Sequence, residues 1–176
     1  MEQLLRNYYS LQHKVDELCR QITGEFAEYI ACHPGCDGCC RDISVFWVEA
    51  AAMATALREL SPPRIAEIRS RVSAGIPEAG CPLLRNGRCD LYEARPVICR
   101  THGLPLLTLQ DREKTVDFCP MNFCGISSIP GRAVIDLSRL NTMLVSVNTL
   151  FTSEFFNAGP PDNERLTISE ALLLEL

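Results

Sequence analysis

The feature that most constrains the fold of this chain is the stretch 32–40, which reads C-H-P-G-C-D-G-C-C. Four thiols, one imidazole and two glycines within nine residues are too polar for a core and too rich in sulfur for an ordinary loop. Thiolates are soft ligands that select zinc or iron–sulfur clusters. Glycine lets the backbone turn sharply enough for several sulfurs to converge on one ion. The stretch therefore predicts a metal site.

Length and composition limit what surrounds this site. A chain of 176 residues with 47% hydrophobic content can bury a core of its own, and ten cysteines are too few for a miniature disulfide scaffold. We expect one domain over residues 1–176, mainly α-helical, with helices packed around an irregular cysteine-rich metal-binding centre and one or two short β-hairpins. The cysteine-rich region is predicted at residues 32–124, between helical packing segments at 1–31 and 132–176.

The chain shows no sign of export or of a membrane partner. Its first residues include Glu2 and Arg6 and lead straight into a helical pattern, so no signal peptide is visible. No apolar run approaches the length of a membrane span. We therefore expect a cytoplasmic protein, where reducing conditions favour metal binding over a disulfide framework. The net charge of -5 argues against nucleic acid as a partner, while a protein partner stays open.

Helical periodicity dominates both ends of the chain. A first helix is predicted over residues 3–30, because apolar residues recur at spacings of three and four: Leu4, Tyr8, Leu11, Val15, Leu18, Ile22, Phe26 and Tyr29. Cys19 lies beside this stripe, far in sequence from the other thiols, and is interpreted as a small buried hydrophobe. Gly24 weakens the helix and favours a bend or a break there.

Capping signals place four further helices. A helix over 47–60 begins at Trp47, and Ser61 followed by Pro62 starts a third that Gly75 ends. Asp136 is the expected cap of a long helix that ends near residue 157 and packs on the first. The spacing of Thr167 and Glu170 is that of a capping box for a last helix over 168–174. Trp47 is interpreted as a core residue.

The remaining sulfurs follow residue 80, in a region of loops and short turns. Asn86-Gly87 is a turn signal between Cys81 and Cys89, so a tight hairpin is predicted there, with both sulfurs directed at one ion. A second hairpin is expected over 104–118. His33 and His102 are reserve ligands, and Cys124 stays an open alternative to a cysteine ligand.

The flanking residues of the cysteines carry a family resemblance. After 32–40 the order is Cys81-Pro-Leu-Leu, Gly87-Arg-Cys89, Tyr92-Glu-Ala-Arg-Pro-Val-Ile-Cys99-Arg100 and Cys119-Pro-Met-Asn-Phe. This order resembles the YkgJ-type cysteine cluster family, named for a CxxCxxCC signature, although the first gap here is three residues rather than two. The resemblance covers Cys32 to about Phe123 and implies zinc or iron chelation by eight cysteines. Carried over residue by residue, it implies these ligands: Cys32, Cys36, Cys39, Cys40, Cys81, Cys89, Cys99 and Cys119.

Eight thiolates divide naturally into two tetrahedral four-sulfur sites, or hold fewer ions if some cysteines are spectators. The adjacent Cys39 and Cys40 project in different directions, so they serve different ions or one of them bridges. Five arginines lie within four residues of a cysteine, either as compensation for the thiolate charge, which we prefer, or as a small anion patch. They are Arg41, Arg85, Arg88, Arg95 and Arg100.

The leading hypothesis is a structural or binding module that holds zinc. The first alternative is an iron–sulfur or iron protein for electron transfer or redox sensing, since four cysteines suit such clusters equally well. The second is a metal-dependent enzyme or a methylase-associated domain. Glu49, Glu93 and His102 are available as bases, but no pattern such as H-E-x-x-H commits them, so we assign no catalytic residue. A carboxylate at Glu49 is also favoured simply by the dipole of the helix that it starts.

Overall fold

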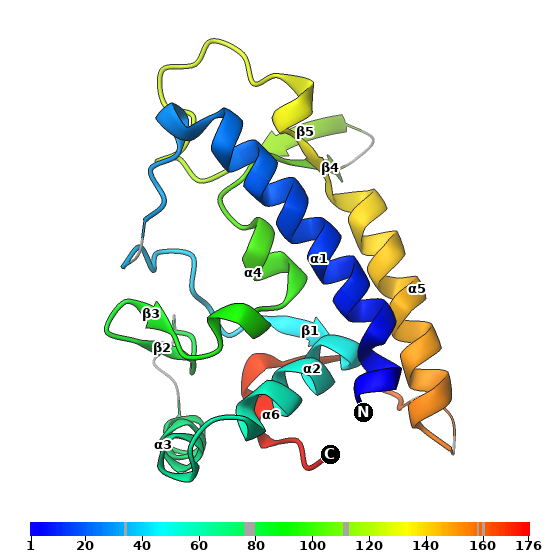
Figure 1. The fold of residues 1–176 in the computed structure, drawn as a ribbon. Coiled ribbons are helices and arrows are strands. Elements are labelled where there is room, and N and C mark those ends of the chain that lie inside the picture. Colours follow the sequence, from blue (N-terminus) through cyan, green and yellow to red (C-terminus); the bar gives the residue numbers. More distant parts are fainter. Residues whose placement is uncertain (34, 76–79, 111–112, 158, 160) are drawn as a thin grey trace.

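The computed structural model describes residues 1–33, 35–75, 80–110, 113–157, 159 and 161–176 (Figure 1). Helices make up most of its regular structure, and the strands are short. In chain order the elements are α1 (Glu2–Glu25), η1 (Ala27–Tyr29), β1 (Ser44–Phe46), α2 (Trp47–Arg58), α3 (Pro62–Ser73), β2 (Leu84–Arg85), β3 (Arg88–Cys89), η2 (Tyr92–Ala94), α4 (Val97–Thr101), β4 (Leu106–Gln110), β5 (Glu113–Asp117), η3 (Gly131–Ala133), β6 (Ile135–Asp136), α5 (Leu137–Phe155), β7 (Arg165–Thr167) and α6 (Ile168–Leu173).

The first helix forms as predicted but ends earlier. Helix α1 stops at Glu25, one residue after Gly24, and the 3-10 helix η1 continues the chain. Its buried face also differs from the predicted stripe, because Leu18 is 39% exposed while Cys19 packs against the core. A spacing of four then links Val15 to Cys19, and a spacing of three follows to Ile22. Both spacings keep the side chains on one helix face.

Helices α1 and α5 lie side by side and antiparallel, as Figure 1 shows. Apolar side chains from both, among them Tyr8, Ile22, Leu140 and Phe151, share one buried cluster. The predicted cap of α5 is confirmed, since the Asp136 side chain accepts a hydrogen bond from the backbone N–H three residues on, at 3.0 Å. The expected packing of the long C-terminal helix on the first helix is therefore confirmed.

A second buried cluster lies on the other side of α2. Helix α2 contributes Ala51 and Ala52 to the first cluster, and Met53 and Leu57 to the second, which α3 and α6 complete. Burial on several sides agrees with its alanine-rich sequence, since an apolar surface all round indicates a helix inside the protein. The side chain of Trp47 is half-buried and packs edge-on against an aromatic ring, so its interpretation as a core residue holds in part.

Both predicted hairpins form, and two further strand pairs were not anticipated. Strands β2 and β3 pair around the Asn86-Gly87 turn, and β4 pairs with β5. In addition β1 pairs antiparallel with β7, and β6 pairs parallel with β4. The mainly helical fold with short hairpins is thereby confirmed. Among the described residues, no helix combines the length and apolar character that a membrane span requires.

Candidate metal centre

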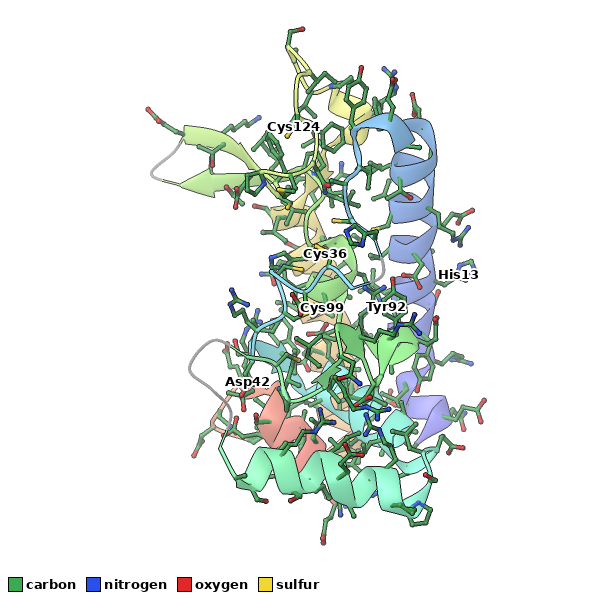
Figure 2. All side chains as sticks on the ribbon, turned by 90° about the vertical axis from the view of Figure 1, so that its left-hand side faces the viewer. His13, Cys36, Asp42, Tyr92, Cys99 and Cys124 are labelled. Atoms are coloured by element: carbon green, nitrogen blue, oxygen red, sulfur yellow. The ribbon has the colours of Figure 1, made fainter. Side chains whose placement is uncertain are left out.

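The stretch 32–40 lies in a segment without helix or strand that connects η1 to β1. Two turns shape it: the N–H of Cys36 donates to the carbonyl of His33 at 3.0 Å, and that of Cys40 to the carbonyl of Asp37 at 2.9 Å. The thiols of the first three cysteines of the stretch are exposed, and Cys40 is half-buried. In Figure 2 this loop runs across the face turned to the viewer, with Cys36 near its middle.

The hairpin β2–β3 positions the next two sulfurs. Asn86 and Gly87 both have positive φ, at 51° and 71°, which is the backbone of the tight turn that this dipeptide favours. Burial raises the pKa of both thiols, and one backbone hydrogen bond to each partly offsets that rise: the N–H of Leu83 donates to Cys81, and the N–H of Leu91 donates to Cys89. Backbone donors are thus already directed at both sulfurs, an arrangement that favours thiolate over thiol.

Helix α4 carries Cys99 and is held at its start by a buried carboxylate. Glu49 is 2% exposed; one of its oxygens accepts the N–H of Phe46 at 3.1 Å and the other that of Val97 at 2.9 Å. It thereby binds the first turns of α2 and α4 together. Burial raises the pKa of the Glu49 carboxyl, and these two backbone donors partly offset that effect. Both carboxylate oxygens therefore accept structural hydrogen bonds. These bonds account for a buried carboxylate at position 49 without assigning it a role as metal ligand or base.

Four of the eight predicted ligands form one group of neighbours, which we call the inner set: Cys40, Cys81, Cys89 and Cys99. Burial raises the pKa of Cys99 to about 12; the neighbouring thiols of Cys81 and Cys89 raise it further, and Arg95 lowers it. Burial likewise raises the pKa of Cys81 and of Cys40 to about 11 each. No member of the inner set is exposed, and two of them pack against the second apolar cluster.

The other four form the outer set: Cys32, Cys36, Cys39 and Cys119. Burial raises the pKa of the Cys32 thiol, a hydrogen bond from Asn122 lowers it, and the thiols of the other three members raise it. The distance from Asn122 Nδ2 to Cys32 Sγ is 3.5 Å. A Cβ placed on Gly103 would lie 3.4 Å from that same sulfur and 3.5 Å from the Cβ of Cys119. Gly103 is therefore where the loop meets Cys119.

The two sets meet at Cys39 and Cys40. Burial raises the pKa of the Cys40 thiol most; the charge of the neighbouring Cys39 thiol and a hydrogen bond between the two side chains raise it further. Within the described residues, no three His, Cys, Asp or Glu side chains are gathered closely enough to hold an ion. The sets are thus neighbourhoods of sulfur rather than coordination polyhedra. The two sets together offer eight thiols, and sulfur is a ligand type that suits zinc and iron. Three of these sulfurs, those of Cys32, Cys81 and Cys89, also accept hydrogen bonds from an amide or a backbone N–H, as metal-bound thiolates do.

Two cysteines lie outside both sets. The Cys19 thiol donates to the carbonyl of Arg100 at 3.5 Å and packs on the first cluster, while burial raises its pKa to about 11. Cys124 donates to the carbonyl of Pro120 at 3.1 Å and is exposed near the upper end of the molecule in Figure 2. Both candidate reserve imidazoles, His33 and His102, are exposed. None of the ten cysteines forms a disulfide.

The predicted arginine shell is only partly present. Burial raises the pKa of the thiols of Cys89 and Cys99, and the charge of Arg95 partly offsets that rise, as expected for compensation. Arg100 does not follow the prediction: its guanidinium binds both carboxylate oxygens of Asp16 at 2.6 Å and joins α4 to α1. A second arginine group surrounds Asp90, where Arg64, Arg71 and Arg85 join α3 to the hairpin.

Asn122 is a site residue that was not predicted. It is 1% exposed, donates to the carbonyl of Gly103 at 2.7 Å and to Cys32, and accepts the N–H of Ala31 at 2.9 Å. The amide thus connects the start of the cysteine loop to the segment that carries Cys119. Its only signal in the sequence was its place in the run Cys119-Pro-Met-Asn-Phe, three residues after a predicted ligand, and that run does not indicate a bond to the distant Cys32.

A buried hydroxyl also lies near the inner set. Tyr8 is fully buried, and its hydroxyl has no hydrogen-bond partner among the described residues. Burial raises its pKa well above the usual value, and the charges of Glu49 and Cys99 act in the same direction. The Tyr8 hydroxyl could donate a hydrogen bond to the Cys99 sulfur once that sulfur is a thiolate, because a thiolate is an acceptor.

Comparison with known families returns one match. Residues 31–120 match the family model CxxCxxCC, described as "Putative zinc- or iron-chelating domain". This match spans more than half of the chain and includes all eight predicted ligands. No curated protein and no solved structure matches the chain.

Proposed function

Because the chain belongs to the CxxCxxCC family, whose domain is described as zinc- or iron-chelating, we propose that it is a zinc-binding module with two four-thiolate sites. The inner set would hold one ion and the outer set the other. One observation carries this division. The thiols that act on Cys32 are those of residues 36, 39 and 119, and the thiols that act on Cys99 are those of residues 40, 81 and 89. These two groups share no member, and among the described residues the one link between the sets is the action of the Cys39 thiol on that of Cys40.

Four thiolates are a closed set of zinc ligands, which is typical of structural rather than catalytic sites. Each occupied site carries a formal charge of about -2, because thiols ligate as thiolates. Arg95 supports the proposal at the inner site, since its charge partly offsets the rise that burial causes in the pKa of Cys89 and Cys99. Structural zinc contributes about 10–16 kcal/mol of binding free energy, which is comparable to the whole stability of a small domain.

The proposal extends to the domain and its surroundings. Residues 1–176 would form one domain, because α2 contributes to both apolar clusters and the sulfur sets lie between elements of both ends of the chain. Ten cysteines without a disulfide suit a reducing compartment such as the cytoplasm.

The direct test is elemental analysis with a visible absorption spectrum on protein purified without oxygen. Colourless protein with about two zinc ions per chain is the expected result. Brown protein that contains iron and sulfide would replace zinc with an iron–sulfur function. Protein that binds no metal would overturn the proposal altogether.

A further inference from the structure

The two sulfur sets differ in their access to solvent. In the outer set Cys32, Cys36 and Cys39 are exposed, and Cys119 alone is half-buried. In the inner set every sulfur is half-buried. An incoming ligand can therefore approach the outer set from several directions without displacing other parts of the protein.

The backbone that carries the outer cysteines is also less constrained than most of the backbone that carries the inner ones. Three outer ligands belong to the loop between η1 and β1, which is shaped by turns. Of the inner ligands, Cys40 belongs to the same loop, whereas Cys81 lies just before the β2–β3 hairpin, Cys89 in β3 and Cys99 in α4. Cys81 and Cys89 accept backbone hydrogen bonds at sulfur and pack on the second apolar cluster, and α4 is held by Glu49 and by Arg100. A movement of the loop would withdraw three ligands from the outer set but only Cys40 from the inner set, whose other three ligands are held by packed elements.

We propose that the outer set is an exchange site, which passes its ion to an acceptor that offers thiolates, whereas the inner set retains its ion. This inference rests on the proposed two-site function. Each step replaces one protein thiolate on the ion by one acceptor thiolate. The acceptor thiol releases its proton as it binds, and the departing cysteine takes up a proton. The ion keeps its charge, so the transfer needs no oxidant or reductant.

The exposed ligands fit this role because ligand exchange at a filled tetrahedral ion begins with the approach of the new ligand. Cys36 is the natural first ligand to leave. It is exposed and lies in the middle of the loop, which crosses the face turned to the viewer in Figure 2. Cys32 would leave last, because the buried Asn122 holds it by a hydrogen bond at 3.5 Å.

The test is a release experiment on full-length protein loaded with zinc. The chelator 4-(2-pyridylazo)resorcinol reports zinc release by absorbance. In parallel, a synthetic peptide with two Cys-x-x-Cys pairs serves as the thiolate acceptor. We expect two phases of about one zinc equivalent each, of which only the fast phase is accessible to the peptide. Iodoacetamide labelling after the fast phase, read by mass spectrometry, should modify the outer cysteines and spare the inner ones.

Matched variants assign the phases. Cys36→Ser should abolish the fast phase and leave the slow one. Cys124→Ser changes an exposed cysteine outside both sets and should leave both phases intact. Release of both zinc equivalents in one phase would overturn the proposed exchange site, and so would labelling of the inner cysteines before the outer ones. In either case, two bound zinc ions would still support the proposed function. Failure to load any zinc would overturn both. The labelling result on the unmodified protein decides the question even if a variant folds poorly.

Discussion

Gly87 at the tip of the β2–β3 hairpin packs directly against Gly35 in the cysteine loop. A Cβ added at Gly87 would lie 3.1 Å from the Cα and 3.3 Å from the carbonyl oxygen of Gly35. Both glycines have positive φ, at 71° and 98°. Contact between two backbones without side chains is what lets the loop and the hairpin bring their cysteines to one place.

Gly87→Ala should therefore weaken metal binding as well as the hairpin. The positive φ costs an alanine about 1–2 kcal/mol, and the methyl group would push the loop away from the hairpin. We expect lower zinc occupancy at the inner set, measured by chelator competition. Gly38→Ala is the matched control, because a Cβ there meets nothing within 4 Å. Equal effects of the two substitutions would contradict the role of this contact.

Asn122→Ala should loosen the outer set selectively. It removes the donor to Cys32 and leaves the carbonyl of Gly103 and the N–H of Ala31 without their partner. Buried groups that lose a partner cost about 1–3 kcal/mol each. We expect a lower midpoint in urea denaturation and faster release of one zinc ion. Asn122→Asp separates the two effects, because it keeps the acceptor for Ala31 and loses only the amide donors. An Asn122→Ala protein with wild-type stability and release would refute this account.

Arg95 and Arg100 should respond differently to substitution. Arg95→Gln removes the charge that favours the thiolates of Cys89 and Cys99, so zinc affinity at the inner set should fall with little change in the fold. Arg100→Lys can keep the charge beside Asp16 but loses the guanidinium hydrogen bonds to the carbonyls of Glu93 and Arg95, so we expect a loss of about 1–3 kcal/mol in stability with zinc stoichiometry unchanged. Chelator competition and urea denaturation on both variants measure the contrast. A reversed pattern would mean that the charge near the thiols comes from Arg100.

Zinc affinity at the inner set should rise with pH. Burial raises the pKa of Cys40, Cys81 and Cys99 to about 11 or 12, so these thiols hold their protons at neutral pH without metal. Zinc must displace those protons, and fewer protons compete as pH increases. Binding should therefore release about four protons per four-thiolate site. Calorimetry in buffers of different ionisation enthalpy counts them. A proton release near zero would show that the thiols are already ionised.

Cys19→Ser should leave bound zinc unchanged and reduce stability. Its thiol lies on the buried face of α1, donates to the carbonyl of Arg100 and belongs to neither set. A hydroxyl there is a poorer fit to an apolar surface, so we expect a lower melting temperature with about two zinc ions retained. Metal analysis and thermal denaturation test this together. Loss of zinc equal to that of Cys99→Ser would place Cys19 among the ligands.

Local signals predicted the elements that depend on neighbours in sequence. Asn86-Gly87 gave a turn, Asp136 and the Thr167–Glu170 pair gave helix starts, and apolar periodicity gave the helices that pack together. The pairing of β1 with β7 was not predictable, because strands so short and so far apart in sequence acquire a partner only when α2 and α6 have packed. The sequence also did not predict that Cys19 rather than Leu18 lies on the buried face of α1. Both positions satisfy a helical spacing, and only the packing of α4 against α1 decides between them.

The sequence by itself determined that eight clustered thiols must be accommodated and that helices surround them, because ligand chemistry and periodicity are properties of residues and their near neighbours. Only the tertiary structure brought particular cysteines near one another, and the proposed division into two sets follows from that. Cys39 and Cys40 are adjacent in the chain and act on each other, yet Cys39 also acts on Cys32 whereas Cys40 also lies near Cys89. Cys119 reaches the loop by way of Gly103 and Asn122, while the hairpin reaches it through the contact of Gly87 with Gly35. These approaches depend on packing between distant segments, which no local pattern encodes.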